Sequence, residues 1–306
     1  STGSYITSVG YQALYSNTAN NADAFGYTAL KNNTTGTDNV GLGKQGLFTN
    51  TTGASNTSVG SGTMYSNSTG SSNTAIGRSA LRSNSTGNDN VAVGQQALED
   101  NTASGNTAVG YASLLQNTSG TNLVSVGKGA LQNNTTANSN TAVGYQAMLA
   151  NTTGGDNVAL GFRALDANTT GNGNVAIGLN ALTDNTTASN NTAVGYLALD
   201  SNTTATSMVA VGERAGNSVT TNSNSTFVGQ IAGRDTTGGD NTFIGQQAGY
   251  SVTSGTKNTI LGRYNGNQSG LDIRTVSNRI VLSDGDGDPR TYNNGASWYF
   301  PANGGT

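Results

Sequence analysis

Asn-Thr-Ala-Val-Gly-Tyr-Gln-Ala-Met-Leu-Ala-Asn-Thr-Thr-Gly, residues 140–154, contains the pattern that decides the fold of this chain. The pattern returns along most of the sequence, and each unit carries a marker Gly preceded by Val, Ile, Leu or Phe. The marker glycines are Gly10, Gly26, Gly43, Gly60, Gly77, Gly94, Gly110, Gly127, Gly144, Gly161, Gly178, Gly195, Gly212, Gly229, Gly245 and Gly262. Twelve of the fifteen intervals are 17 residues and three are 16. Such a fixed period indicates stacked repeats.

Each unit combines a strand pattern with a turn pattern. The residues one and three before the marker Gly are Val, Ile, Leu or Thr, with a small residue between them, as in Val91-Ala92-Val93. This alternation predicts a strand, and the later Asn-Thr-Thr-Gly stretch predicts a turn. A helix is excluded because Gly and Thr interrupt every short apolar cluster. We therefore expect an all-β protein, a β-solenoid of about sixteen 17-residue coils, each close to three faces of six residues.

Stacking of these coils has further consequences. We expect Val and Ile to point inward and to contact the equivalent residues of the coils above and below. At about 4.8 Å per coil, sixteen coils would extend roughly 75 to 80 Å. The 16-residue intervals fit this arrangement when the lost residue lies in a turn, as in 101–105, where we expect the deletion to disturb no ladder.

Asn recurs at two places in the unit. It lies seven residues after the marker Gly in the first twelve units, from Asn17 and Asn33 to Asn202, and four residues before it in eleven of the sixteen. We interpret the recurrence as an Asn ladder whose amides bond along the stack. The alternative is N-glycosylation, because Asn50 and Asn151 each begin an Asn-Thr-Thr acceptor sequence, which we attribute to the turn chemistry.

The end of the chain departs from this unit. After Gly212 the Leu four residues beyond the marker becomes Gly (Gly216, Gly233, Gly249) and the small strand residue becomes Phe (Phe227, Phe243), so we expect narrower or differently packed coils. Beyond about residue 267 the repeat stops. Residues 278–283 and 297–300 are predicted strands around an Asp-Gly-rich turn and an Asn-Asn-Gly turn. The predicted domains are a β-solenoid repeat shaft, 1–266, and a C-terminal β-hairpin cap or transition segment, 267–306.

Composition restricts the function. Only 9% of residues are charged, and Cys and His are both absent, which removes thiolate nucleophiles and the commonest general base and metal ligand. Thirteen basic residues scattered among sixteen acidic ones form no basic stripe, so we expect no nucleic-acid partner. No apolar stretch is long enough for membrane insertion. The chain begins without Met, and we expect a processed product or one segment of a longer polypeptide.

We predict no enzymatic activity, no cofactor and no metal site, because the acidic residues are isolated in turns. Asp284, Asp286 and Asp288 alternate with Gly as in a calcium loop, but Pro289 stands where that loop needs Gly, so a hairpin turn is the favoured interpretation. The residue after the marker Gly varies most and should face solvent. Aromatic rings there could stack on the sugar rings of a polysaccharide or shield the ladder. The candidate contact residues are Tyr11, Tyr27, Tyr111, Tyr145 and Tyr196.

The repeats resemble those of bacteriophage tail fibres, on the units at residues 140–148 and 241–249. They are also similar to the head repeats of trimeric autotransporter adhesins, on the core Asn-Val-Ala-Ile-Gly of residues 174–178. Residues 278–287 resemble the stretch that precedes a self-cleaving intramolecular chaperone domain in such fibres. The resemblance covers about residues 6–266.

The resemblance implies a parallel homotrimer in a virion tail fibre or on an extracellular surface, with a host polysaccharide or outer-membrane protein as partner. It also implies that strand alanines point outward and let three coils approach closely. These alanines are Ala75, Ala92, Ala108, Ala142 and Ala176. The resulting hypothesis is a structural fibre shaft that contacts the host surface.

Two alternatives stay open. One is a bacterial surface adhesin or a self-assembling extracellular filament. The other is an ice-binding solenoid, suggested by the Thr-Thr pairs at residues 34–35, 51–52, 152–153 and 169–170.

Overall fold

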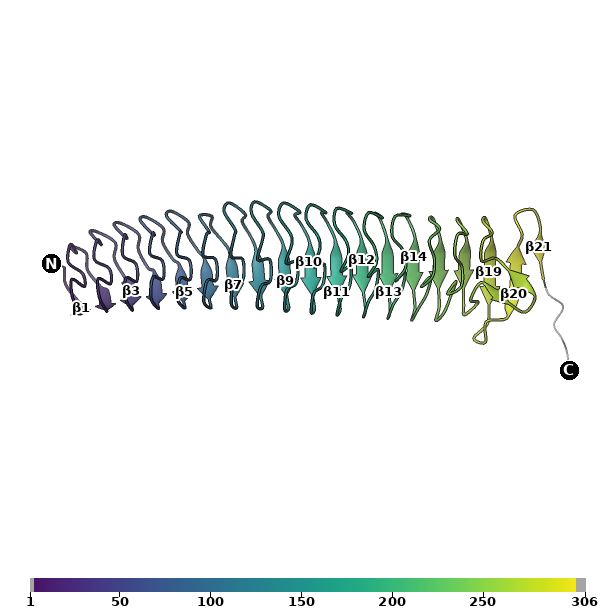
Figure 1. Cartoon of the computed structure of the whole chain (residues 1–306), viewed down its shortest axis with the longest axis horizontal. Coiled ribbons are helices and arrows are strands. Elements are labelled where there is room, and N and C mark those ends of the chain that lie inside the picture. The colour runs from purple at the N-terminus through teal and green to yellow at the C-terminus, as the bar shows by residue number, and fades with distance from the viewer. Residues whose placement is uncertain (1–2, 301–306) are drawn as a thin grey trace. The chain divides into compact units, whose positions relative to one another are not determined.

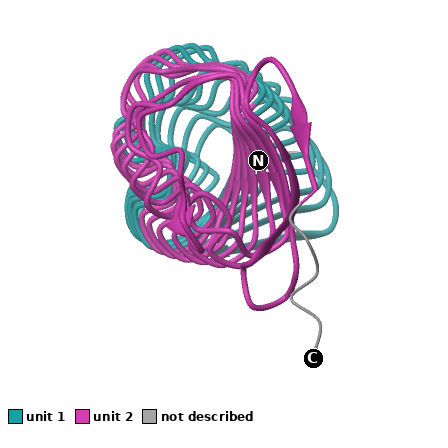
Figure 2. Ribbon diagram, turned by 90° about the vertical axis from the view of Figure 1, so that its right-hand side faces the viewer, with its two compact units in different colours: residues 1–156 teal, residues 157–306 magenta. Residues whose placement is uncertain are grey.

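The computed structural model describes residues 3–300 and is all-β over that range. It contains no helix there, and hence none that could cross a membrane. The chain divides into two compact units, Ser1–Asp156 and Asn157–Thr306. Each unit is a parallel β-solenoid in which every repeat forms one coil, as predicted (Figures 1 and 2). Sixteen repeat strands are described, nine in the first unit and seven in the second.

The first unit stacks nine short strands side by side in parallel. Equivalent residues pair from coil to coil, for example Val91 with Thr107 and Ala92 with Ala108. The strands are β1 (Ile6–Val9), β2 (Ala22–Phe25), β3 (Asn39–Leu42), β4 (Thr57–Val59), β5 (Thr74–Ile76), β6 (Val91–Val93), β7 (Thr107–Val109), β8 (Val124–Val126) and β9 (Thr141–Val143).

The second unit continues the pattern and ends in hairpins. Its repeat strands are β10 (Val158–Leu160), β11 (Val175–Ile177), β12 (Thr192–Val194), β13 (Val209–Val211), β14 (Thr226–Val228), β15 (Thr242–Ile244) and β16 (Thr259–Leu261). A small hairpin follows, β17 (Asn267–Gln268) with β18 (Leu271–Asp272). Then β19 (Ile280–Ser283) pairs in parallel with β16, and β20 (Pro289–Asn293) and β21 (Trp298–Tyr299) follow in antiparallel order. The predicted C-terminal strands and hairpin turns are therefore present, and residues 301–306 lie outside the described residues.

Each strand faces the opposite way from our prediction. Ala75, Ala92, Ala108, Ala142 and Ala176 are fully buried, whereas Ile76 and Val91 keep 41% and 37% of their surface exposed. The strand alanines therefore line the core and are not free to bring three coils together. Alternation separates the two faces of a strand, but it does not say which face is inside. The Leu four residues after the marker Gly determines which face of the strand is buried. This Leu is itself buried and leaves room only for a small strand residue opposite it.

Two strands show that the turn Leu and the strand residue opposite it occupy the same space. In β3 the small residue is Gly41, and a Cβ atom built there would lie 3.1 Å from Cγ of Leu30. In β14 the small residue is replaced by Phe227, and the opposite Leu is replaced by Gly233, where a Cβ atom would lie 2.4 Å from the Phe227 ring. In the late coils a Gly–Phe pair thus replaces the Leu–Ala pair of the earlier coils. This replacement is the different packing that we expected after Gly212.

Only one of the three predicted faces forms a strand. The rest of each coil is a series of turns with repeated positive φ angles, and the core Leu residues themselves have φ between 48° and 55°. This conformation costs a non-glycine residue roughly 1–2 kcal/mol. Burial of the Leu side chain contributes a similar or larger amount. The marker Gly has φ between 105° and 143°, and a Cβ atom on Gly77 would lie 2.6 Å from the backbone of Gly94.

Buried Asn side chains replace much of the apolar core, as the ladder interpretation predicted. Nδ2 of Asn50 donates to Oδ1 of Asn33 at 2.7 Å and to the carbonyl of Gly53 in its own turn at 2.9 Å. A second ladder lies before the strand, where the backbone amide of Asn56 donates to Oδ1 of Asn39. Asn50 and Asn151 are fully buried. They are therefore inaccessible to a glycosyl donor in the folded chain.

The shortened coil between Gly94 and Gly110 alters one ladder. The sheet register across β6 and β7 is intact, as expected. In the turn, however, Nδ2 of Asn101 donates to the carbonyl of Ala103 and does not reach Asn84, whose buried Oδ1 has no partner. Our expectation that the deletion disturbs no ladder was therefore wrong for the Asn ladder. In the shortened turn the Asn101 amide bonds the carbonyl two residues on, whereas Asn84 bonds the carbonyl three residues on.

Candidate binding surfaces

One face of each unit is a sheet with an apolar outer surface. We call it the outer sheet face, and it consists of the residues one and three before each marker Gly. Its larger apolar members include Val9, Phe25, Ile76, Val91 and Val124 in the first unit and Val158, Leu160, Val209, Val211, Ile244 and Leu261 in the second. All of these keep between 37% and 54% of their surface exposed. Further Val, Leu and Ile residues and nine Thr residues fill the remaining places, and Asp23 is the one charged residue among them.

The outer sheet face of the first unit has the size of a functional surface patch. Nine strands about 4.8 Å apart, each about 10 Å long, give a footprint of about 400 Å². Contiguous apolar patches of a few hundred Å² on soluble proteins commonly mark interaction sites. Because equivalent residues lie in register, two parallel copies would present matching rows to each other.

The five candidate tyrosines lie beyond the sheet, each one residue after a marker Gly. They keep between 40% and 63% of their surface exposed, in agreement with a solvent-facing position. Tyr11 stacks on Tyr27 with ring centroids 5.4 Å apart, and the amino group of Lys128 lies 5.7 Å from the Tyr111 ring and 6.0 Å from the Tyr145 ring. These ring faces are turned along the stack toward neighbouring coils. Ring edges and hydroxyl groups are therefore the parts offered to a ligand.

A second aromatic column lies five residues after the marker Gly in the first unit. Phe48 stacks on Tyr65 with centroids 5.1 Å apart. Lys31 covers the outer face of Phe48 at 5.8 Å, and Arg82 covers Tyr65 at 6.0 Å. Sequence analysis overlooked this column, although Tyr15, Lys31, Phe48, Tyr65 and Arg82 recur at the repeat spacing. That spacing was the signal that could have found it.

The acidic loop between β19 and β20 forms a hydrogen-bonded turn. Oδ1 of Asp284 accepts the backbone amides of Asp286 at 3.0 Å and Asp288 at 2.9 Å, and its other oxygen pairs with Arg290. Asp288 accepts the Ser269 hydroxyl. Among residues 3–300, no cluster of three or more Asp, Glu, His or Cys side chains could hold a metal ion. The loop residues are thus engaged as the hairpin interpretation expects.

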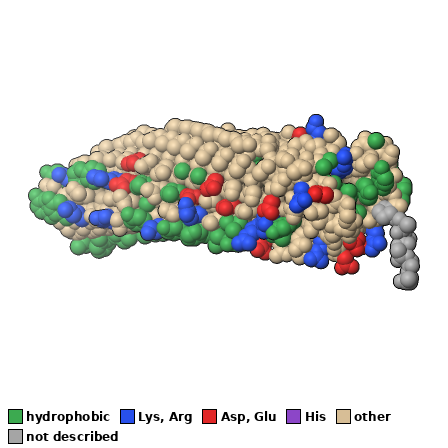
Figure 3. Space-filling view, turned by 45° about the vertical axis from the view of Figure 1, so that its right-hand side comes forward, with side chains coloured by type: hydrophobic (Ala, Val, Ile, Leu, Met, Phe, Trp, Pro, Cys, Tyr) green, Lys and Arg blue, Asp and Glu red, His purple; other side chains and the backbone are tan. Residues whose placement is uncertain are grey.

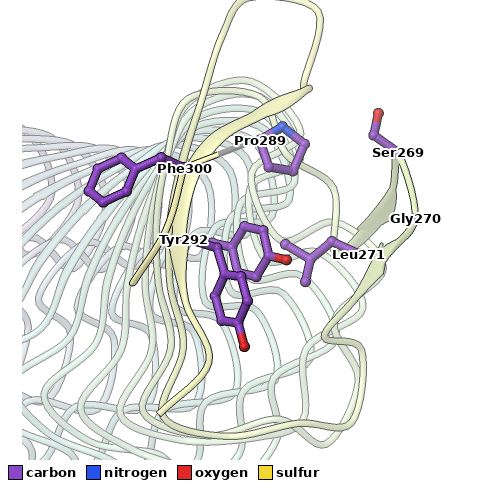
Figure 4. A pocket seen from close by; sticks show the side chains of 7 residues that line it. Ser269, Gly270, Leu271, Pro289, Tyr292 and Phe300 are labelled. Atoms are coloured by element: carbon purple, nitrogen blue, oxygen red, sulfur yellow. The ribbon is translucent and has the colours of Figure 1, made fainter. Parts of the chain in front are cut away.

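The hairpins enclose a pocket of about 290 Å³ near the end of the described chain. Its walls are Leu271, Pro289 and the stacked rings of Tyr292 and Tyr299, whose centroids are 5.0 Å apart. Figure 4 shows the Leu271 side chain directed toward the Tyr292 ring. Nearby, the buried hydroxyl of Tyr264 donates to the carbonyl of Leu271 at 2.6 Å, and burial raises its pKa. The pocket is therefore a mostly apolar gap where the β17–β18 hairpin packs against β20 and β21.

The first threonine of a turn pair bonds along the stack. The first Thr of a pair donates its hydroxyl to the carbonyl of the next coil, as Thr34 does to Thr51 at 2.9 Å. Thr51 in turn donates to Ser68 at 3.0 Å. These hydroxyl groups therefore stabilise coil stacking and are not a free array of donors.

Two aspartates have raised pKa values. Burial, and secondarily the Asp184 carboxylate, raises the pKa of Asp200. Burial, and secondarily Glu99, raises the pKa of Asp100. The acidic neighbour of Asp200 lies on an adjoining coil and that of Asp100 is the preceding residue, and neither aspartate lines a described pocket.

Comparison of the chain with protein-family models, curated proteins and solved structures gives no match.

Proposed function

We propose that this chain is the shaft of a bacteriophage tail fibre, in which three parallel copies pack through their outer sheet faces and the turns contact the host surface. The observation that supports this proposal most directly is the exposed apolar face. In an isolated chain the Val, Ile and Leu side chains of that face would lie in water on coil after coil. Burial of apolar surface contributes roughly 25 cal/mol per Å², so repetition along the stack makes association favourable.

The architecture suits an extended structural element. Each coil contacts only its neighbours, so stability grows with coil number, and no long-range closure is needed. Because Cys is absent, the stack depends on the Asn ladders, the parallel sheet and the Leu core. The tyrosine column and the turns remain outside the outer sheet face and are available for contact with the host surface.

A cross-linking experiment tests parallel packing. The chain has no Cys, so Val91→Cys introduces a single thiol on the outer sheet face. In a parallel, in-register assembly the same residue of each copy lies near its equivalents. A short bismaleimide should therefore join Val91→Cys chains covalently. Thr52→Cys, in an exposed turn, is the control and should remain uncoupled. Equal coupling at both positions, or none at Val91→Cys, would overturn the proposed packing.

A further inference from the structure

A surface notch of about 360 Å³ lies in the first unit, outside the outer sheet face. The residues that line it are Gln45, Ser61, Gly62, Tyr65, Arg78, Ser79 and Arg82. They come from three successive coils, those of Gly43, Gly60 and Gly77. The notch arises because the middle coil places Ser61 and Gly62 where its neighbours have Lys44 and Gln45 on one side and Arg78 and Ser79 on the other. Two small residues between larger ones leave the gap.

The notch is positively charged. From residue 39 to residue 88 the sequence contains Lys44, Arg78 and Arg82 and no Asp or Glu, although the whole chain has a net charge of −3. Arg82 is held 3.7 Å from Glu99 of the following coil and lies over the Tyr65 ring. Arg78 is exposed, and among the described residues it forms no salt bridge. Figure 3 shows Lys and Arg side chains in separate groups amid broad uncharged polar surface.

The other groups of the notch suit a polyhydroxylated ligand. The side chains of Ser61, Ser79 and Gln45 offer hydroxyl and amide groups, and no hydrogen bond of the two Ser hydroxyls occurs in the part of the chain that the structure describes. A guanidinium group binds carboxylate and sulfate through paired N–H donors. Hydroxyl and amide groups can bind ring hydroxyls by donating or accepting hydrogen bonds. The half-buried Tyr65, stacked on Phe48 and covered by Arg82, adds its ring edge and hydroxyl group.

We propose that the notch binds an oxyanion-bearing sugar unit of an acidic polysaccharide, with Arg78 as its principal anion ligand. The inference deepens the proposed contact with the host surface and rests on that function. The shared chemistry is a carboxylate or sulfate on a pyranose ring. Binding requires both the charge of Arg78 and the space above Gly62.

Isothermal titration of the full chain tests the proposal with three probes of equal length. These are an oligogalacturonate hexamer, a κ-carrageenan hexasaccharide, which carries sulfate but no carboxylate, and neutral maltohexaose. We expect at least one acidic probe to bind and the neutral one not to bind, with affinity falling as salt is added. Preference for the first acidic probe identifies a carboxylate ligand, and preference for the second identifies a sulfate. Comparable binding of maltohexaose, or no binding of either acidic probe, would overturn the proposal.

Two variants separate the notch from general charge attraction. Arg78→Gln should weaken binding at least tenfold, because a charge-assisted hydrogen bond is lost. Gly62→Gln retains every charge but fills the gap. Gly62 has φ of 65°, Gln45 and Gln96 adopt 61° at the equivalent place, and a Cβ atom on Gly62 meets nothing within 4 Å. This variant should fold and lose binding. If it binds as the wild type does, the notch is not the site.

The matched control is Arg263→Gln, which removes an Arg from the same column position in the second unit. It should leave binding unchanged. Failure of this proposal can be distinguished from failure of the proposed assembly. Association of chains is measured by mass and cross-linking, whereas binding at the notch is measured by sugar titration. Acidic-sugar binding by a chain that does not associate would overturn the fibre packing and leave the notch proposal supported.

Discussion

At the residue scale, the side chain opposite each strand determines which face of that strand is buried. Sequence analysis predicted the strands correctly but placed Val and Ile inside. An alternating triplet such as Val91-Ala92-Val93 is compatible with either orientation. The deciding contact lies between the strand and a Leu of the turn region, which adopts positive φ and reaches the core. No local pattern announces that conformation, because Leu is rarely found there.

The exchange of Leu–Ala for Gly–Phe predicts a double-mutant cycle. Phe227→Ala should destabilise the chain by about 3–5 kcal/mol through the cavity it leaves. Gly216→Leu alone should also destabilise it, because a Cβ atom on Gly216 would already lie 2.7 Å from the Phe227 ring of the next coil. The double variant recreates the pair found in earlier coils and should recover most of the loss. Urea unfolding measures all three, and simple addition of the two losses would contradict the account.

A half-buried aspartate gives a prediction with a defined pH dependence. Burial and Asp184 raise the pKa of Asp200 above that of an unfolded Asp, about 3.9. The folded state then binds the proton more tightly than the unfolded state, so stability falls as pH rises through the folded pKa. Asp200→Asn should therefore raise Tm at pH 7 and leave it nearly unchanged at pH 3. Asp89→Asn, in an exposed turn, is the control. A gain at pH 3 equal to that at pH 7 would contradict the assignment.

At the scale of the element, the coil is held by polar ladders as much as by apolar packing. The Asn recurrence predicted these ladders because a buried amide repeated at a fixed spacing can satisfy its neighbours above and below. The broken rung at Asn84 could not be predicted in the same way. It depends on the height of one shortened turn, which is a geometric consequence of a missing residue and leaves no compositional signal.

The broken rung supplies a matched test. Asn67 donates to Asn50 and accepts from Asn84, both at 2.9 Å, whereas Oδ1 of Asn84 has no partner. Asn67→Ala therefore removes one hydrogen bond more than Asn84→Ala does. We expect Asn67→Ala to be the more destabilising by about 1 kcal/mol. Thr69→Ala, at an exposed turn position, should change the free energy of unfolding little. Denaturant titration that ranks Asn84→Ala as the costlier change would refute the ladder assignment.

At the scale of the whole molecule, the period and composition predicted a stacked all-β chain, and the structure confirms the parallel solenoid in both units. The surfaces were harder to predict. The notch beside Arg78 depends on side chains from three coils, so it becomes visible only when the sequence is arranged in columns. The absence of acids between residues 39 and 88 was a signal within the sequence that the repeat pattern obscured.

The outer sheet face leads to a prediction for association. Val91→Glu combined with Val124→Glu places charges on two exposed strand positions without touching the core. The variant should retain the far-ultraviolet circular dichroism of the wild type and fail to associate, because burying carboxylates in an apolar contact is unfavourable. Thr52→Glu, in a turn, should associate normally. A double variant that associates as the wild type does would exclude the outer sheet face as the contact.

The mass of the wild-type chain in solution, measured by multi-angle light scattering, tests the central claim most directly. Packing of three copies through the outer sheet face predicts three times the chain mass of 30.8 kDa. A mass of 30.8 kDa at working concentration, unchanged on further concentration, would contradict it.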